Sequence, residues 1–340
     1  MKITDARAAI RSHRELMAGG WSNRDVAGAV RRGVLVRLSR GLYVDAALWQ
    51  RSHPEDRELI RAVAAHRRLR GGGVTFVLTS AGALHGLPLV RTRASRPHVA
   101  GRQVNGQVRA SAPFVARHEW SLSEDDVVEV DGIRCTSLSR TVADLLRCLC
   151  PEAAISVVDA ALRQRAWHEG RGQYDIDEAE RFRGEVAAHL APGSRGVVQA
   201  RELLALADGR ADGPGESISR LYLHRLGFAP RIQVAIAGPK GRDYHIDFDI
   251  DEADVWGEFD GAVKYTDAAM RGGDEDAAAV VLREKAREDW IRGTTGRRMI
   301  RWGWEHLADL ETFAARLAAF GVSLPRSRTE PSSPAPTLIS

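Results

Sequence analysis

The spacing of apolar residues over the first fifty positions predicts three helices followed by a two-stranded hairpin. Ser22 is placed to cap the third helix and Gly33 to end it, while Gly41 falls in the turn of the hairpin. The helices are expected over residues 3–13, 14–20 and 22–33, and the hairpin over residues 34–44. Short helices joined by a glycine-containing turn and followed by a hairpin predict a winged helix over residues 1–50.

The stretch from residue 51 to residue 208 alternates helical and extended patterns, which predicts a mixed α/β middle domain. Helices are expected over residues 54–69, 80–89, 137–149 and 152–166, and a strand over residues 74–80. Two histidines in this stretch, His85 and His118, have no nucleophile or metal-ligand partner at a recognisable spacing. We therefore expect them to be packing or surface residues rather than catalytic ones.

A turn-rich segment at residues 208–217 precedes a third domain, expected over residues 209–322. Its pattern gives helix, strand, hairpin, helix, strand and closing helix, which is typical of an α/β domain with a mixed sheet. These elements are expected over residues 216–227, 231–238, 244–265, 280–293, 297–304 and 305–321. Residues 323–340 are rich in Pro and Ser and are expected to be disordered. The predicted fold class is α/β, or α+β overall.

The composition is that of an ordinary water-soluble globular chain, because 44% of the 340 residues are hydrophobic and 28% are charged. No apolar run is long enough to cross a membrane, and the N-terminal stretch lacks the hydrophobic core of a signal peptide. We therefore expect a cytoplasmic protein without a membrane partner. The three cysteines lack the paired spacing of a zinc site, which indicates buried or idle thiols.

Positive charge is concentrated near the N-terminus. Residues 1–70 contain 15 Lys and Arg against 7 Asp and Glu, a net charge of +8, whereas the remaining residues carry −4. Arginine binds phosphate in a bidentate fork, which indicates a polyanion partner, although a solvated basic face explains the composition equally well. The winged-helix pattern favours double-stranded DNA over a protein-interaction role. The expected DNA contacts are Asn23, Arg24, Arg31 and Arg32 in the recognition helix and Arg37 and Arg40 in the wing.

The C-terminal hairpin crowds carboxylates onto two short strands, and strict alternation divides their side chains between two faces. The expected apolar face consists of Tyr244, Ile246, Phe248, Ile250, Val255, Gly257 and Phe259. The expected polar face consists of His245, Asp247, Asp249, Trp256, Glu258 and Asp260. A turn centred on Glu252 and Ala253 places Asp247 directly opposite Glu258 and makes these two carboxylates neighbours.

Carboxylates on facing positions lie about 5 Å apart and repel each other, so a compensating charge is needed. Mg²⁺ held by Asp247 and Glu258 would supply it, with Mn²⁺ as the alternative ion. An acidic surface facing solvent also explains the alternation and is slightly favoured on that pattern alone. Three further features favour the metal site, namely Glu216 in the domain's first helix, Lys264 after the hairpin, and Lys285 in the following basic helix. Metal-dependent phosphodiester hydrolysis needs groups of these kinds.

The segment from about residue 213 to residue 321 resembles the PD-(D/E)XK nuclease superfamily, in particular its very-short-patch-repair-like branch. A helix Glu, a strand Asp, an acidic E-x-D-G and a downstream REKxRED…W helix recur there in this order. The resemblance implies a restriction-endonuclease-like domain in which Glu216 is the helix acid, and Asp247 and Glu258 are the two metal-binding acids. The lysine usual two positions after the second acid is Asp260 here. The resemblance therefore leaves Lys264 and then Lys285 as replacements, with Asp260 and Lys285 as accessory residues.

The segment from residue 1 to about residue 208 resembles the AbiEi-type antitoxin family of bacterial type IV toxin–antitoxin systems. The resemblance is carried by "AGGWSNRDVAGAVRRGVLVRLSRGLYV", "SAGALHGLPL" and "TSLSRTVADLLR" in this order. It implies a winged-helix transcriptional regulator that represses its own promoter, with a toxin as partner. The motifs "GLPL" and "SRTVADL" have structural rather than chemical roles on this interpretation.

Two functions remain open, and both require DNA binding. In the first, the chain is a Mg²⁺-dependent DNA endonuclease, in which Glu216 orients a ligand water and Lys264 positions or deprotonates the attacking water. In the second, it is an antitoxin-like repressor whose nuclease-like domain is catalytically silent and serves in homodimer formation or partner capture. The combination of Glu216, Asp247, Glu258 and a nearby lysine favours the first.

Overall fold

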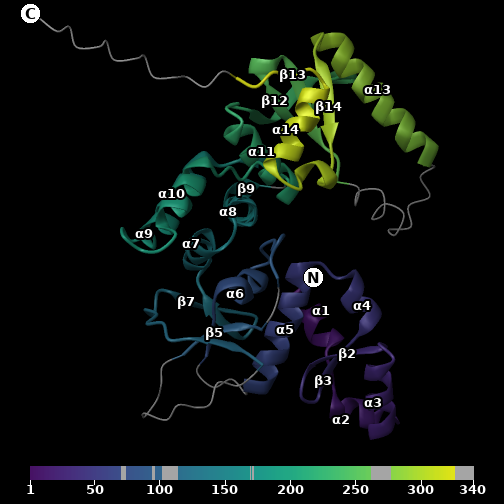
Figure 1. Ribbon diagram of the computed structural model, residues 1–340, viewed down its shortest axis with the longest axis vertical. Helices are drawn as coiled ribbons and strands as arrows, with labels where there is room; N and C mark the ends of the chain where they lie inside the picture. Colours follow the sequence, from purple (N-terminus) through teal and green to yellow (C-terminus); the bar gives the residue numbers. More distant parts are fainter. Residues whose placement is uncertain are drawn as a thin grey trace, which may run out of the picture. The chain divides into compact units, whose positions relative to one another are not determined.

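The computed structural model describes residues 1–69, 74–93, 96–101, 114–168, 170, 172–261 and 277–325. It divides into two compact units, Met1–Ser217 and Ile218–Ser340, whose elements are labelled in Figure 1. The division falls within helix α11 (Pro214–Arg225), so this helix contributes residues to both units.

The first unit begins with three helices and a small sheet. Its elements are α1 (Ile3–Ala9), β1 (Arg11–Ser12), α2 (His13–Ala18), α3 (Asn23–Arg31), β2 (Leu35–Ser39) and β3 (Leu42–Asp45). The strands form an antiparallel sheet in the order β1-β3-β2, and Gly41 adopts a positive φ of 77° in the turn between β2 and β3. This order is that of a winged helix, in which β2 and β3 form the wing.

The winged helix is continuous with the body of the first unit. Ile3 and Ala6 of α1 belong to the same buried cluster as Leu59 and Val63 of α5 (Pro54–Leu69), and α4 (Ala46–Arg51) connects β3 to α5. The body contains a mixed five-stranded sheet in the order β6-β5-β4-β8-β7. Its strands are β4 (Thr75–Phe76), β5 (His98–Ala100), β6 (Ala116–His118), β7 (Val127–Val130) and β8 (Ile133–Thr136).

Helices complete the first unit, and local sequence signals fix where they begin. Ser137 caps α7 by accepting a hydrogen bond from the Arg140 backbone N–H, and Pro151 occupies the first position of α8. The helices are α6 (Leu78–Leu84), α7 (Leu138–Cys148), α8 (Pro151–Ala166), α9 (Ile176–Ala188) and α10 (Val197–Leu206). A two-stranded hairpin of β9 (Trp167–His168) and β10 (Gln173–Tyr174) lies between α8 and α9 in the chain.

The second unit is built on a mixed four-stranded sheet in the order β11-β12-β13-β14. The strands are β11 (Arg231–Ala237), β12 (Asp243–Ile250), β13 (Val255–Phe259) and β14 (Arg298–Trp302). The pairs β11–β12 and β12–β13 are antiparallel, whereas β14 runs parallel to β13. Short 3₁₀ turns lie at Pro239–Gly241, Asp251–Ala253 and Trp304–Leu307.

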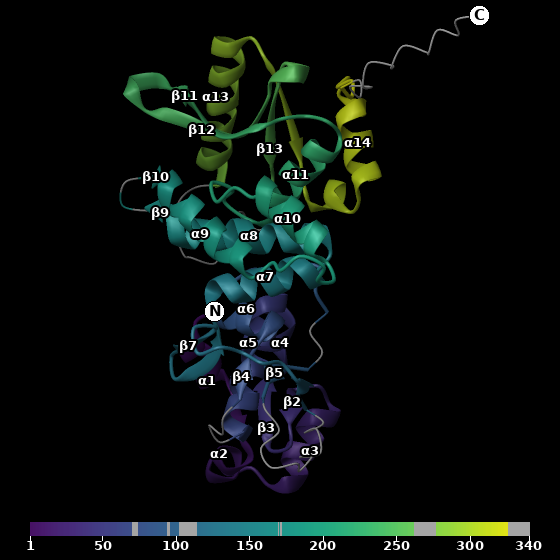
Figure 2. The same cartoon turned by 90° about the vertical axis from the view of Figure 1, so that its left-hand side faces the viewer.

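Helices cover both faces of this sheet, as Figure 2 shows for α13 (Ala277–Thr295) and α14 (Leu310–Ala319). On the α14 face, Trp302 packs edge-on against Phe313 and tilted against Phe248. Gly257 makes room for this ring, because a Cβ atom there would lie 2.3 Å from Trp302 Cη2. On the opposite face, Ile291 of α13 packs with Trp256 of β13. The sheet is therefore the central layer of an α/β/α arrangement.

The predicted α/β class is confirmed, and the six elements expected in the C-terminal domain occur in the expected order. The strand expected over residues 74–80 is wrong in extent, because only Thr75–Phe76 is extended and Leu78, with a φ of 52°, begins α6. The helix expected over residues 3–13 is also wrong in extent, since it ends at Ala9. Across the described ranges, none of the helices is both long and apolar enough to cross a membrane.

Candidate functional site

Helix α3 is held in the winged helix by its cap and by its apolar face. The Ser22 hydroxyl accepts a hydrogen bond from the Asp25 backbone N–H at 3.2 Å, and the Ser22 backbone N–H donates to Asp25 Oδ2 at 2.8 Å. This cap lowers the pKa of Asp25 through the side-chain and backbone hydrogen bonds from Ser22. Val26 and Ala29 pack with residues of α2 and the wing, so the polar face of α3 is turned outward.

A hollow of about 400 Å³ lies between the outward face of α3 and the wing. Asn23 and Arg31 from α3 and Arg37 from β2 line it together, so the structure brings three of the six predicted DNA contacts to one concave surface. All three are exposed. Val26, Ala27, Val30 and Tyr43 line the hollow as well, and its two arginines are of a type suited to phosphate.

The other three predicted contacts are exposed but do not line this hollow. The Arg32 guanidinium lies back across α3, because a Cβ atom on Gly28 would come within 2.9 Å of its Nη1. Arg40 lies in the turn of the wing, and Arg24 lies in the first turn of α3. These arginines add positive charge around the hollow rather than within it.

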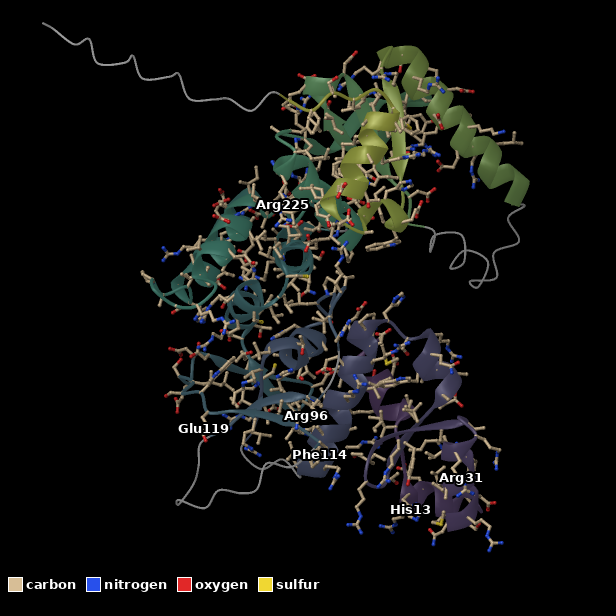
Figure 3. The ribbon with its side chains drawn as sticks, in the orientation of Figure 1. His13, Arg31, Arg96, Phe114, Glu119 and Arg225 are labelled. Carbon is tan, nitrogen blue, oxygen red and sulfur yellow. The ribbon has the colours of Figure 1, made fainter. Side chains whose placement is uncertain are left out.

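Five residues of the hollow were not among the predicted contacts, namely His13, Val26, Ala27, Val30 and Tyr43. His13 is the first residue of α2, whose cap is Ser12, and Figure 3 labels it together with Arg31. The start of α2 at His13 was not predicted, because the first helix was expected to continue to residue 13. Ser12 and Glu15 nevertheless have the spacing of a capping box. Tyr43 is a largely buried residue of β3 and packs in the small core shared by α2, α3 and the wing.

In the second unit, the predicted register of the acidic hairpin is confirmed. Phe248 pairs with Gly257 and Ile250 with Val255, which is the offset that puts Asp247 and Glu258 at opposed positions. The loop contains four residues, and its last one, Asp254, adopts a left-handed φ of 52°. The ladder ends at Phe248, and beyond it the Asp247 carboxylate accepts a hydrogen bond from the Phe259 backbone N–H at 2.8 Å.

The strict alternation predicted along β12 is wrong. Ile246 packs with Trp256 and Ile291 on the α13 face, whereas Phe248 packs with Trp302 on the α14 face. Residues two apart in a regular strand share a face, so the strand changes facing near Asp247. The partner strand carries the matching irregularity, since Gln233 has a φ of 52°. The sequence pattern could not reveal this, because the apolar residues still alternate with polar ones.

Asp249 was expected on the polar face, but it is buried with 1% exposure. Arg231 donates to its Oδ2, and Arg297 forms an ion pair with its Oδ1 at 2.8 Å. The Arg297 guanidinium also lies 4.1 Å above the Trp256 ring. Asp249 therefore belongs to a structural ion-pair group that connects β11, β12 and the start of β14.

Glu258 is also nearly buried, with 9% exposure, and two guanidinium groups hold its carboxylate. Arg287 of α13 pairs with Oε1 at 2.7 Å, and Arg301 of β14 donates to Oε2 at 3.1 Å. Burial lowers the pKa of the Arg287 guanidinium, but the hydrogen bond and charge of Glu258, together with Glu284 and Asp247, raise it above its ordinary value. Both oxygens of the predicted second metal acid are thus engaged by cationic side chains.

Of the remaining predicted residues, Asp260 and Lys285 lie in the second unit. Glu216 belongs to the first unit, where its Oε2 accepts a hydrogen bond from the Asp212 backbone N–H at 2.9 Å. Lys264 lies outside the described residues. Asp260 is exposed and its backbone N–H donates to the Trp302 carbonyl, while Lys285 is exposed on α13.

The carboxylate donors of the hairpin suit Mg²⁺ in chemical type, because this ion prefers oxygen ligands. Asp247 and Glu258 would hold it. Within the described ranges, however, no group of three or more His, Cys, Asp or Glu side chains is arranged to bind a metal ion. A cation would also have to replace at least one guanidinium group on Glu258.

Comparison with known proteins gives relatives but no family assignment. No protein-family model matches the chain. Two relatives come from Mycobacterium tuberculosis, the uncharacterized protein MT2308 of strain CDC 1551 / Oshkosh and the uncharacterized protein Rv2248 of strain ATCC 25618 / H37Rv. Each is 29% identical over 259 residues, which is 76% of this chain and 82% of the relative. The matched length exceeds that of either unit, so the similarity extends into both.

Proposed function

We propose that this protein binds double-stranded DNA through α3 and the wing of its first unit. The observation that carries the proposal is the hollow in which Asn23, Arg31 and Arg37 meet from two different elements. Arginine recognises phosphate through a planar fork, and a helix with a free polar face fits the major groove. The concentration of positive charge within the first 70 residues adds long-range attraction for a polyanion.

A protein-interaction role for the winged helix is less well supported. Half of the residues that line the hollow are polar or charged, namely His13, Asn23, Arg31 and Arg37, and the others are Val26, Ala27, Val30 and Tyr43, whereas the core of a protein interface is usually depleted of charged residues. Leu16 of α2, Val26 of α3, and Leu35 and Tyr43 of the wing are buried in the small core that holds these elements together. The exposed surface therefore favours an anionic partner.

A gel-shift assay with random-sequence duplex DNA tests the DNA-binding proposal. The double variant Arg31→Ala/Arg37→Ala is expected to bind at least tenfold more weakly at low salt, because both arginines leave the phosphate surface. Arg165→Ala/Arg181→Ala is the matched control, since it removes the same charge from α8 and α9. Equal affinity of the wild type and the Arg31/Arg37 variant would refute the assignment.

We further propose a second function, a Mg²⁺-dependent DNA endonuclease activity in the second unit, with Mn²⁺ as an alternative ion. Its support is the hairpin register, which makes Asp247 and Glu258 neighbours at the edge where β12 and β13 diverge. When bound, the ion would activate water and stabilise the negative charge that develops on the phosphate. Glu216 would orient a ligand water and Lys264 would position or deprotonate the attacking water, with Asp260 and Lys285 as accessory residues.

The alternative is an antitoxin-like transcriptional repressor with a silent nuclease-like unit, acting with a toxin partner or as a homodimer. The engagement of Glu258 by Arg287 and Arg301 favours this alternative for the unliganded protein. Incubation of supercoiled plasmid with purified protein and Mg²⁺ or Mn²⁺ separates the two. Cleavage that disappears in Asp247→Asn supports the endonuclease, whereas intact plasmid under every metal condition supports the repressor.

A further inference from the structure

One row of side chains on α3 lines the hollow beside the wing. Asn23, Ala27 and Arg31 follow one another at intervals of four residues, so they share one face of the helix, and all three are exposed. Figure 3 labels Arg31, the last residue of α3. Four residues of a helix span about 6 Å along its axis. The row therefore presents an amide, a methyl group and a guanidinium group, each about one helical turn from the next.

The Asn23 amide is available for an external partner. Asn23 is the first residue of α3, but Ser22 and Asp25 form the capping hydrogen bonds of this helix. Among the residues that the structure describes, none forms a hydrogen bond with the Asn23 side chain. An Asn amide carries two N–H donors and one carbonyl acceptor side by side. In the protein alone, these groups have only water as their partner.

The hollow also has an apolar part that a phosphate strand would leave without a matching contact. Ala27 contributes an exposed methyl group, and Val30 lies half-buried three residues later. In the major groove of DNA, the C5-methyl group of thymine is an apolar partner, and Ala is one of the residues that contact it. The combination of an unpaired amide and a methyl group therefore fits base edges better than a sugar–phosphate backbone.

We propose that Asn23 and Ala27 read base edges and give this protein a preference for duplex sites that contain A·T pairs. The inference rests on the proposed DNA binding through α3 and the wing. The Asn23 amide N–H donates to adenine N7 and its Oδ1 accepts from the adenine N6 amino group, which is the bidentate pairing between Asn and this base. The Ala27 methyl group contacts a thymine one or two pairs away, because about 6 Å of helix matches one or two steps of about 3.4 Å along the duplex.

The two arginines of the hollow have a different role in this arrangement. Arg31 ends the row on α3, and Arg37 lies on β2 in the wing. They contact phosphates, which position the helix on the duplex but carry no sequence information. Loss of a phosphate contact weakens binding to all sequences alike, whereas loss of a base contact removes discrimination at one position. The two kinds of residue can therefore be separated by experiment.

Selection of bound duplexes from a random-sequence library by the full chain tests the proposal. The duplexes enriched by the wild type are expected to share at least one A·T pair. In the enriched duplex, replacement of the shared adenine by 7-deazaadenine removes N7 from the major groove and should weaken wild-type binding about tenfold. Replacement of the contacted thymine by uracil removes only its methyl group and should weaken binding about threefold.

Two variants assign the preference to a residue. Asn23→Ala should bind the adenine and 7-deazaadenine duplexes equally well, because it has lost the amide that pairs with N7. Arg31→Ala is the contrasting variant from the same row. It should weaken binding to both duplexes alike and keep the tenfold difference between them.

The proposal is overturned if the enriched duplexes share no A·T pair, or if the wild type binds the 7-deazaadenine duplex as tightly as the unmodified one. It is also overturned if Asn23→Ala keeps the difference between the two duplexes, since the readout then belongs to another residue. The comparison of modified bases uses the wild type alone, so it decides the question even if a variant fails to fold.

The same selection separates this inference from the DNA binding on which it rests. Wild-type binding that is equally tight for all duplexes would support the proposed DNA binding and overturn the role of Asn23 and Ala27. Absence of binding to any duplex would refute both. The two failures therefore give different results.

Discussion

Replacement of Asp249 by Asn should destabilise the second unit, because it removes one charge from a buried ion pair. The carboxylate has 1% exposure and pairs with Arg297, whose side chain is 13% exposed, and with Arg231, which is 70% exposed. In the variant, Arg231 can return to water, whereas Arg297 stays largely buried. The cost therefore arises mainly from Arg297.

The expected loss is about 3 kcal/mol, at the lower end of the range for breaking a buried pair. Arg297 retains hydrogen bonds to the Ile250 and Val255 carbonyls at 3.2 Å and an ion pair with Asp254 at 3.0 Å. Asp254 is 83% exposed, so water screens that pair and reduces its contribution. The 2.8 Å ion pair to Asp249 also leaves Oδ1 without a well-directed hydrogen bond, which limits the loss.

Urea unfolding of the full chain measures this loss, with hydrogen exchange of peptides from β11 to β14 to assign it to the second unit. Asp251→Asn is the matched control, since it removes the same charge from the same hairpin at a residue that is 83% exposed. Its effect should stay below about 0.5 kcal/mol. Equal effects of the two variants would show that Asp249 is a solvated acid and would refute the structural role assigned to it.

Three further predictions concern DNA affinity, packing and pH. In the Arg31→Ala/Arg37→Ala variant, the slope of log affinity against log salt should fall by about 2, since each lost phosphate contact contributes about 0.9, and an unchanged slope contradicts the phosphate contacts. Gly257→Ala should lower the stability of the second unit by about 1–3 kcal/mol in urea unfolding, because its Cβ atom would lie 2.3 Å from the Trp302 ring; a neutral result would mean that the ring moves freely. Burial, with the charges of His118 and Arg96, lowers the pKa of His98 from 6.5 to about 4, so the folded state binds fewer protons than the unfolded state between these values. The first unit should therefore lose stability as the pH falls from 6.5 toward 4, and His98→Asn should flatten a plot of melting temperature against pH.

Local sequence signals were sufficient for most elements of the fold. The capping residues and the helical period located α3, α5, α7 and α8, and the turn at Gly41 located the wing. The boundary between the first two helices was predicted at residues 13–14, but α1 ends at Ala9 and α2 begins at His13. The capping-box spacing of Ser12 and Glu15 was the signal that could have found it.

The candidate acidic site was harder to predict than the strands that carry it. Pair register follows from the turn, so the opposition of Asp247 and Glu258 could be worked out from residue numbers. The burial of Asp249 and the engagement of Glu258 depend on arginines that lie 29 to 48 positions later or 18 positions earlier in the chain. No periodicity connects such residues, because only the packing of β14 and α13 against the sheet brings them together.

The buried cluster that unites α1 with α5 bears on how the proposed DNA-binding surface can be studied. A fragment cut after residue 50 would leave Ile3, Ala6 and Ile10 facing water without Leu59 and Val63, so a shorter piece is a poor substitute for the intact unit. The predicted winged helix is consequently part of the first unit and not a separately folding domain. If the proposed DNA binding tilts α1, we expect α5 to move with it, because the two helices share one buried cluster.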